Sequence, residues 1–241
     1  MYEKLRGVVL GTIKYSDKHN IVHIYTDVHG RMAFAVPLGN THGSRRRNAL
    51  LMPLSLVEME GRVMPGRELA TMRDLRSLQP LIDIHTDPVK NAVALFMGEL
   101  LSHCIVEQER NETLFSFIEH SVLTLETQQR GVANFHICFL YRLGEHLGIQ
   151  PDIETYQPGA WFDMDGGVFS LHPAGVQHLM RPDEAAVIKL ISRMSYSNLH
   201  LFRFNREQRN QVLDTILAYL RLHNSTLGTL RSPDVLKQLF V

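Results

Sequence analysis

Hydrophobic and polar residues alternate in short runs over the first 80 residues of the chain. In the run NIVHIYT, successive side chains would point to opposite faces of a strand, which is the pattern of a half-buried β-strand. Five such runs predict strands at Gly7–Tyr15, Asn20–Thr26, Arg31–Pro37, Leu50–Glu60 and Leu69–Leu78. Asp27–Gly30 reads as a turn and Asn40–Asn48 as a polar loop. Five short strands separated by turns indicate a small closed barrel.

After Pro80 the pattern changes to helical spacing. Capping residues mark several helix starts: Asp87 before Pro88, Asn111, and Asn205 with Gln208 three residues later, while Gly148 can end a helix. The predicted helices run from Asp87 to about Glu109, Asn111 to about Leu125, Val132 to Leu147, Asp183 to about Met194, Asn205 to about His223, and Pro233 to Phe240. Between Pro151 and Pro173 the helical signal stops, and WFDMDGGVFSL predicts a hairpin around Asp165-Gly166.

These patterns define an α+β chain with more than one domain. We expect a five-stranded barrel over residues 1–80, followed by a mostly helical domain over 81–241 with a short hairpin insert at about 151–173.

Charge is distributed unevenly along the 241 residues, although the formal net charge is zero. Residues 1–80 hold 12 Lys and Arg against 7 Asp and Glu, and the remainder holds 13 against 18. A basic first part suits a polyanionic partner, but uneven sampling explains so modest an excess equally well.

Two cysteines, Cys104 and Cys138, exclude a disulfide framework and a four-cysteine zinc site. Both lie in apolar helical patterns, so we expect buried free thiols in a reducing compartment. The chain shows no signal-peptide pattern at its start and no long apolar run, so we expect a cytoplasmic protein that makes no membrane contact.

The best candidate site is the run Arg45-Arg46-Arg47 in the predicted polar loop. Three adjacent guanidinium groups can reach several phosphates, and loops and strand faces of small barrels are where such folds bind single strands. If all three contact phosphates, replacing them lowers the slope of log affinity against log salt concentration by up to about 3. Three further cations are candidates for the same face: Lys14, Lys18 and Arg31. The alternative is that these basic residues only solvate a surface loop. Three aromatic residues either stack on bases or fill the barrel: Tyr15, Tyr25 and Phe34.

Other constellations favour structural roles. The 13 histidines are scattered without metal-ligand spacing, and Asp163 and Asp165 lack the further ligands of a calcium loop. Glu107, Glu109 and Glu112 fit a solvated corner between helices. The chain carries none of the motifs GxSxG, GxxxxGK[ST] or GxGxxG, so we expect a binding protein with no cofactor rather than an enzyme.

Several strings, in order along nearly the whole chain, resemble the RecO family of bacterial recombination mediators. RGVVLGTIKYSDKHNIVHIYTDVHGRMAFAVPLG resembles the opening strands of that family. The first helix pair of the family resembles the run LFMGELLSHCIVEQERNETLFSFIEHSVLTL. The family's helix before a variable insert resembles FLYRLGEHLGIQPD, and its closing segment resembles LGTLRSPDVLKQLF.

The resemblance implies an N-terminal OB-fold barrel and a helical C-terminal domain in a nucleoid-associated DNA-repair protein. It implies binding of single- and double-stranded DNA and annealing of complementary strands. It further implies action with RecR and with single-stranded-DNA-binding protein to help load RecA, without nucleotide and without bond-making chemistry.

The insert departs from the family pattern, and no sequence motif assigns the partner-binding pocket. Many relatives hold zinc through four cysteines in the insert, whereas DIETYQPGAWFDMDGGVFSLHP contains none, so we expect no metal and a hairpin held by Trp161, Phe162 and Phe169. The family also implies a helical-domain pocket for the acidic, apolar tail of the single-stranded-DNA-binding protein. Its candidate residues are Arg130, Phe139, Arg142 and Leu143, although ordinary helix-surface charges fit the two arginines as well.

The residues alone leave one alternative from another class, an RNA-binding or adaptor protein with the same barrel, which would bind RNA as well as single-stranded DNA and would not anneal strands. A hydrolase needs a positioned nucleophile and base in a polar pocket, and the sequence shows neither.

Overall fold

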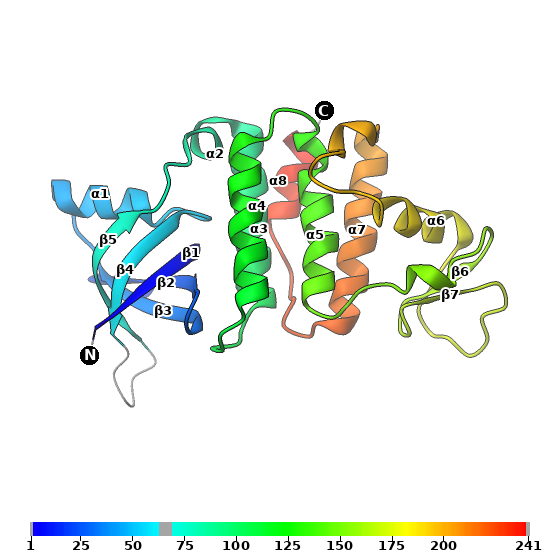
Figure 1. The fold of residues 1–241 in the computed structure, drawn as a ribbon, viewed down its shortest axis with the longest axis horizontal. Helices are drawn as coiled ribbons and strands as arrows, with labels where there is room; N and C mark the ends of the chain where they lie inside the picture. The colour runs from blue at the N-terminus through cyan, green and yellow to red at the C-terminus, as the bar shows by residue number, and fades with distance from the viewer. Residues whose placement is uncertain (1, 63–68, 240–241) are drawn as a thin grey trace. The chain divides into compact units, whose positions relative to one another are not determined.

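The computed structural model describes residues 2–62 and 69–239, and two compact units divide it at Thr127. Unit 1 covers Met1–Thr127 and unit 2 covers Gln128–Val241. Unit 1 contains the five-stranded antiparallel sheet and the first helices, and unit 2 contains the remaining helices and the hairpin (Figure 1).

The sheet of unit 1 has the strand order β3-β2-β1-β4-β5. Its strands are β1 (Glu3–Lys14), β2 (His19–Thr26), β3 (Gly30–Pro37), β4 (Leu56–Arg62) and β5 (Thr71–Ser77). All five predicted strands are present, but the fourth begins at Leu56 and not at Leu50, which is the last residue of α1. The long β1 pairs with β4 through its first half and with β2 through its second, so the sheet curls around it.

The curled sheet is OB-like, but it does not form the closed barrel that the sequence predicts. Its edge strands meet at one isolated bridge, Phe34 with Ala70, where the Ala35 N–H donates to the Ala70 carbonyl at 3.1 Å and the Ala70 N–H donates to Ala33 at 2.8 Å. Within the described residues, no longer ladder joins β3 to β5.

Both faces of the sheet are buried in the middle of β1 and along β2, where apolar residues follow one another, whereas β5 is mostly exposed. The concave side holds a cluster that includes Val22, Ile24 and Phe34. On β2 the alternate residue Tyr25 lies against Phe115 of α4, with ring centroids 6.2 Å apart. The predicted turn at Asp27–Gly30 is confirmed, and Gly30 has φ +62, a conformation that favours glycine.

The helices of unit 1 are α1 (His42–Leu50), α2 (Ile82–Thr86), α3 (Pro88–Cys104) and α4 (Glu112–Thr127). The predicted caps are confirmed: the Asp87 carboxylate accepts from the Val89 and Lys90 N–H groups, and the Asn111 side chain accepts from Leu114. α3 packs on β1, where Gly98 allows the helix backbone to approach Leu10 closely.

Unit 2 is arranged around α5 (Phe135–His146), which follows a short 3-10 turn, η1 (Val132–Asn134), and contacts α6 (Pro182–Ile191) and α7 (Arg206–His223). The remaining elements are η2 (Ile153–Thr155), β6 (Trp161–Asp163), β7 (Val168–Ser170), β8 (Leu179–Met180), η3 (Leu199–Leu201) and α8 (Ser232–Leu239). The predicted Asn205–Gln208 capping box is confirmed, and Gly148 follows α5 with φ +72. The predicted end of the last helix, Phe240, lies outside the described residues.

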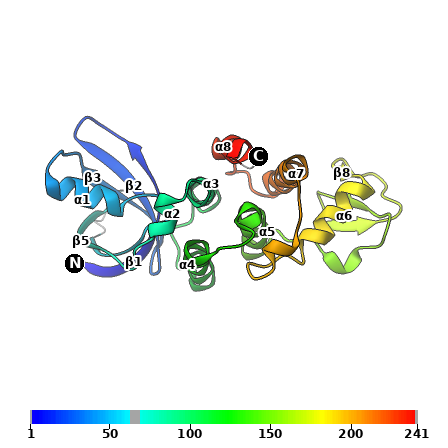
Figure 2. The ribbon, with the colours of Figure 1, turned by 90° about the horizontal axis from the view of Figure 1, so that it is seen from above.

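The predicted hairpin is confirmed as β6 and β7, and an additional short strand, β8, pairs with β6 under α6 (Figure 2). Phe162 is fully buried between Phe169 and Tyr219, with ring centroids at 4.7 Å and 5.3 Å. Trp161 is half-buried. Aromatic packing therefore holds the hairpin, as the sequence predicts for Phe162 and Phe169.

Candidate nucleic-acid interface

The three adjacent arginines lie on a helix, α1, and not in the polar loop that the sequence predicts. Thr41 caps this helix, because its hydroxyl accepts a hydrogen bond from the Ser44 N–H at 3.2 Å. The run between the cap and Leu50 is polar on every side, so it lacks the apolar stripe from which a helix is normally recognised. The helix fixes the directions of the Cα–Cβ bonds of the three arginines.

Arg45 and Arg46 differ from Arg47 in their surroundings. The first two side chains are exposed, and no acceptor within the described part of the chain contacts either guanidinium. Arg47 is half-buried and donates from Nη2 to the Pro37 carbonyl at the end of β3. Arg47 therefore anchors α1 to the sheet, while Arg45 and Arg46 keep their donors available to a ligand.

Lys14 and Lys18 lie at the turn between β1 and β2, at the same end of the sheet. The Ser16 hydroxyl shapes this turn by accepting from the Lys18 and His19 N–H groups. The Lys18 carbonyl accepts from the Leu38 N–H at 2.8 Å, next to the Pro37 carbonyl that Arg47 contacts. Lys14 pairs only loosely with Asp17, at 3.6 Å, and both side chains are exposed. We call the four exposed cations the cationic end: Lys14, Lys18, Arg45 and Arg46.

The structure gives Arg31 a different environment from the other predicted DNA-binding residues. Its side chain is half-buried, and Nη1 donates to the Ser102 carbonyl at 2.6 Å and to the Ile105 carbonyl at 3.0 Å. Burial lowers the pKa of this guanidinium. Arg31 therefore satisfies carbonyls at the C-terminal end of α3 and is not part of the cationic end.

Two of the three aromatic candidates fill the core. Tyr25 and Phe34 are almost fully buried, and burial raises the pKa of Tyr25 to about 12. Their predicted stacking role is wrong, and the alternative prediction of core residues is confirmed. Tyr15 is 64% exposed at the turn that carries the cationic end, so it stays a candidate for stacking on a base.

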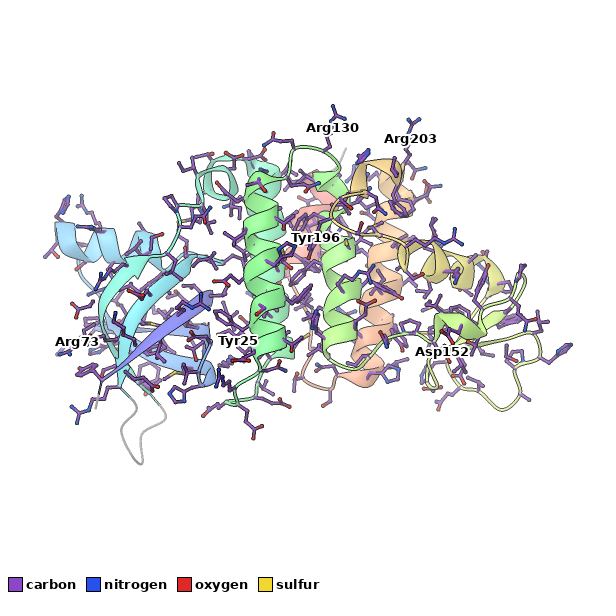
Figure 3. All side chains as sticks on the ribbon, in the orientation of Figure 1. Tyr25, Arg73, Arg130, Asp152, Tyr196 and Arg203 are labelled. Atoms are coloured by element: carbon purple, nitrogen blue, oxygen red, sulfur yellow. The ribbon has the colours of Figure 1, made fainter. Side chains whose placement is uncertain are left out.

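Two arginines on β5 were not among the predicted site residues. Arg73 donates to Glu60 at 2.7 Å, and its guanidinium lies over the Tyr2 ring at 4.0 Å (Figure 3). Arg76 is exposed and opposite Glu58 in the strand register. Simple alternation along β5 does not predict the outward position of Arg76, because a register shift between Glu58 and Glu60 places both Met72 and Leu75, three residues apart, against the core cluster.

The predicted partner pocket on the helical domain is wrong in two of its four residues. Phe139 and Leu143 are fully buried in α5 and line no outer surface. Arg142 donates to Glu145 at 2.7 Å and to the Met194 carbonyl at 2.7 Å, so it joins α5 to the end of α6. Arg130 alone projects into solvent (Figure 3).

In the insert at about 151–173, side-chain hydrogen bonds close the hairpin turn. The hairpin turn is closed by the Asp163 side chain, which accepts from the Asp165 and Gly166 N–H groups at 2.9 Å. Asp165 in turn accepts from the His178 ring at 2.9 Å. No group of three or more His, Cys, Asp or Glu side chains in the described ranges could hold a metal. Cys104 and Cys138 are buried elsewhere, and burial raises the pKa of both thiols to about 12.

None of the helices described in the structure is long and apolar enough to cross a membrane.

The fold and the cationic end define an OB-like protein with an attached helical unit. Two family models match the sequence, Recombination protein O N terminal over residues 1–81 and Recombination protein O C terminal over residues 85–156. The chain is 39% identical over 241 residues to the DNA repair protein RecO of Bacteroides fragilis, with both chains covered completely. It is 37% identical to that of Phocaeicola vulgatus, again over both complete chains, and 31% identical to that of Porphyromonas gingivalis over 98% of each. The chain belongs to the RecO family of DNA-repair proteins.

Proposed function

We propose that this protein is a non-catalytic mediator of recombinational DNA repair that binds DNA through the cationic end and anneals complementary strands. The observation that carries the proposal is the pair Arg45 and Arg46 on α1, two exposed guanidiniums that contact no acceptor among the described residues of a RecO-family chain. Guanidinium groups bind phosphate oxygens through paired hydrogen bonds, and such contacts do not depend on base sequence. The cationic end thus suits single strands and duplexes of any sequence.

The helical unit supplies the contact with protein-coated strands. We infer that it binds the acidic tail of the single-stranded-DNA-binding protein, with Arg130 as the exposed cation. Holding one strand on the cationic end while recruiting a second, coated strand raises the local concentration of complementary sequences. With RecR, the same recruitment helps RecA load onto the coated strand. No step in this scheme makes or breaks a covalent bond.

A strand-annealing assay tests the proposal. Two complementary fluorescent oligonucleotides, precoated with the cognate single-stranded-DNA-binding protein, are mixed with and without this protein in the absence of nucleotide. We expect faster pairing with the wild type and loss of the acceleration when Arg45, Arg46 and Arg47 are all replaced by glutamine.

A folded protein that leaves the pairing rate unchanged, with coating verified, would rule out the annealing function. Binding of RNA as tight as binding of single-stranded DNA would then favour an RNA-binding or adaptor role for the same sheet.

A further inference from the structure

A cavity of about 270 Å³ opens beside α1 in unit 1. It lies between the end of α1, the start of β4, the end of β5 and α2. Its lining is largely apolar and includes no carboxylate among the described residues: Ala49, Leu50, Ser55, Val57, Ser77, Gln79, Pro80, Leu81, Ile82 and His85. We call it the α1–α2 cavity.

The free arginines of the cationic end share a helix face with this cavity. Arg45 and Arg46 precede the lining residues Ala49 and Leu50 by one turn, and residues four apart lie one above the other on the same side of a helix. On the opposite wall, Ser77 of β5 lines the cavity across from Val57, and the neighbouring Arg76 points to the other face of the strand. Cations therefore border the apolar cavity on its α1 side.

Large apolar side chains remain open to solvent at the cavity. Ile82, which lines it, is 65% exposed, and Leu50, on the α1 side, is partly exposed. The polar side chains of Gln79 and His85 also line the cavity and can form hydrogen bonds with a ligand. An apolar surface with a few polar groups, and with cations on its α1 side, matches a nucleotide, whose base is flat and weakly polar and whose phosphate is anionic.

We propose that the α1–α2 cavity takes an unstacked nucleobase of a single strand whose neighbouring phosphates lie on Arg45 and Arg46. The inference rests on the proposed function, because it assumes that α1 holds phosphates. In a duplex the bases are stacked and paired, so a duplex offers this surface its phosphates alone. The phosphate site alone does not discriminate between single strands and duplexes, and the cavity adds a preference for single strands.

The test compares two probes of equal length and equal phosphate number, a fluorescent oligothymidylate and an oligonucleotide in which the central nucleotides are abasic. We expect the wild type to bind the base-containing probe roughly 5- to 100-fold tighter, the range that base contacts with protein surfaces provide. Equal affinity for both probes would overturn the cavity proposal and leave phosphate binding intact. Binding of neither probe would overturn the proposed function itself.

A matched pair of variants locates the base. Ala49→Phe fills the cavity from an exposed position of α1, and Asn48→Phe adds the same side chain at the neighbouring exposed position, which does not line it. We expect Ala49→Phe to bring the affinity ratio of the two probes close to one without weakening the abasic probe. Asn48→Phe keeps the wild-type ratio.

A ratio that Ala49→Phe leaves unchanged would place the base elsewhere and contradict the proposal. A second outcome would also contradict the proposal. An acidic peptide with an apolar end would bind the wild type and not Ala49→Phe, while the two oligonucleotide probes would bind both proteins with the same affinity ratio.

Discussion

The exposed face of α1 and the joint between α5 and α6 both carry arginines, and the two regions use them differently. On α1, Arg45 and Arg46 extend into solvent without a protein acceptor in the described structure. At the joint, Arg142 donates to a carboxylate and to carbonyls of residues about 50 positions further along the chain. An arginine whose donors are used by the fold stabilises that fold, whereas one with unused donors is available to a phosphate.

Replacing Arg142 should produce the largest change in stability. In Arg142→Ala the Ser192 and Met194 carbonyls and Glu145 lose their donor, and hydrogen bonds to a charged group contribute about 1.5 to 3 kcal/mol. We expect the free energy of unfolding in urea to fall by about 2 to 3 kcal/mol, since the side chain is only 31% exposed. Arg130→Ala in the same unit is the matched control and should change it by less than about 0.5 kcal/mol. Equal losses in the two variants would contradict the distinction between engaged and free arginines.

Acid should destabilise the protein through a buried group of unit 2 rather than through the cationic end. Burial, with the nearby charge of Arg209, lowers the pKa of His136 to about 3. Below the ordinary value of 6.5 the unfolded chain binds a proton at this site that the folded chain does not bind until about pH 3. The free energy of unfolding therefore decreases as the pH is lowered through this window, by about 2 kcal/mol from pH 7 to pH 5.

Urea unfolding at several pH values measures this contribution. His136→Gln should flatten the pH dependence between pH 7 and pH 5, while His200→Gln, at an exposed position of η3, should keep it. A pH dependence that both variants share with the wild type would show that His136 takes up its proton normally in the folded state.

The smallest expected effect on stability is at α1. Arg45→Gln combined with Arg46→Gln removes two exposed charges that stabilise no other part of the described structure, so we expect a change within about 0.5 kcal/mol by urea unfolding. A loss above about 2 kcal/mol would show that these side chains support the fold and would remove the basis for assigning them to a ligand.

The sequence predicted the features of the fold that depend on local chemistry. Asp87, Asn111 and Asn205 cap helices as expected, because a side-chain oxygen that can accept from the first N–H groups is a short-range signal. The five strands and the Asp165-Gly166 hairpin were predicted from alternation and turn residues alone. The run that became α1 was missed, because a short polar helix has no apolar periodicity.

The sequence could not predict which arginines and aromatic residues are accessible. Arg31 and Arg45 look alike in the sequence, and only tertiary packing places the first against the Ser102 carbonyl, 71 residues away. Phe139 and Leu143 were expected to border a groove, but α5 is buried on nearly every side as the central helix of unit 2. Sequence spacing gives the face of a helix and does not show what covers that face.

The most direct test of the central claim is the salt dependence of single-stranded DNA binding. Each phosphate contact contributes about 0.7 to the slope of log affinity against log salt for a single strand. Arg45→Gln with Arg46→Gln should reduce that slope by about 1.4, and Arg47 should add little because its donor is used by Pro37. The control variant is Arg73→Gln with Arg110→Gln, which also removes two positive charges. Because these two arginines already pair with Glu60 and Glu112, the control should leave the slope near the wild-type value. A slope that the α1 variant does not change, or that the control variant changes equally, would contradict the claim that α1 holds the phosphates.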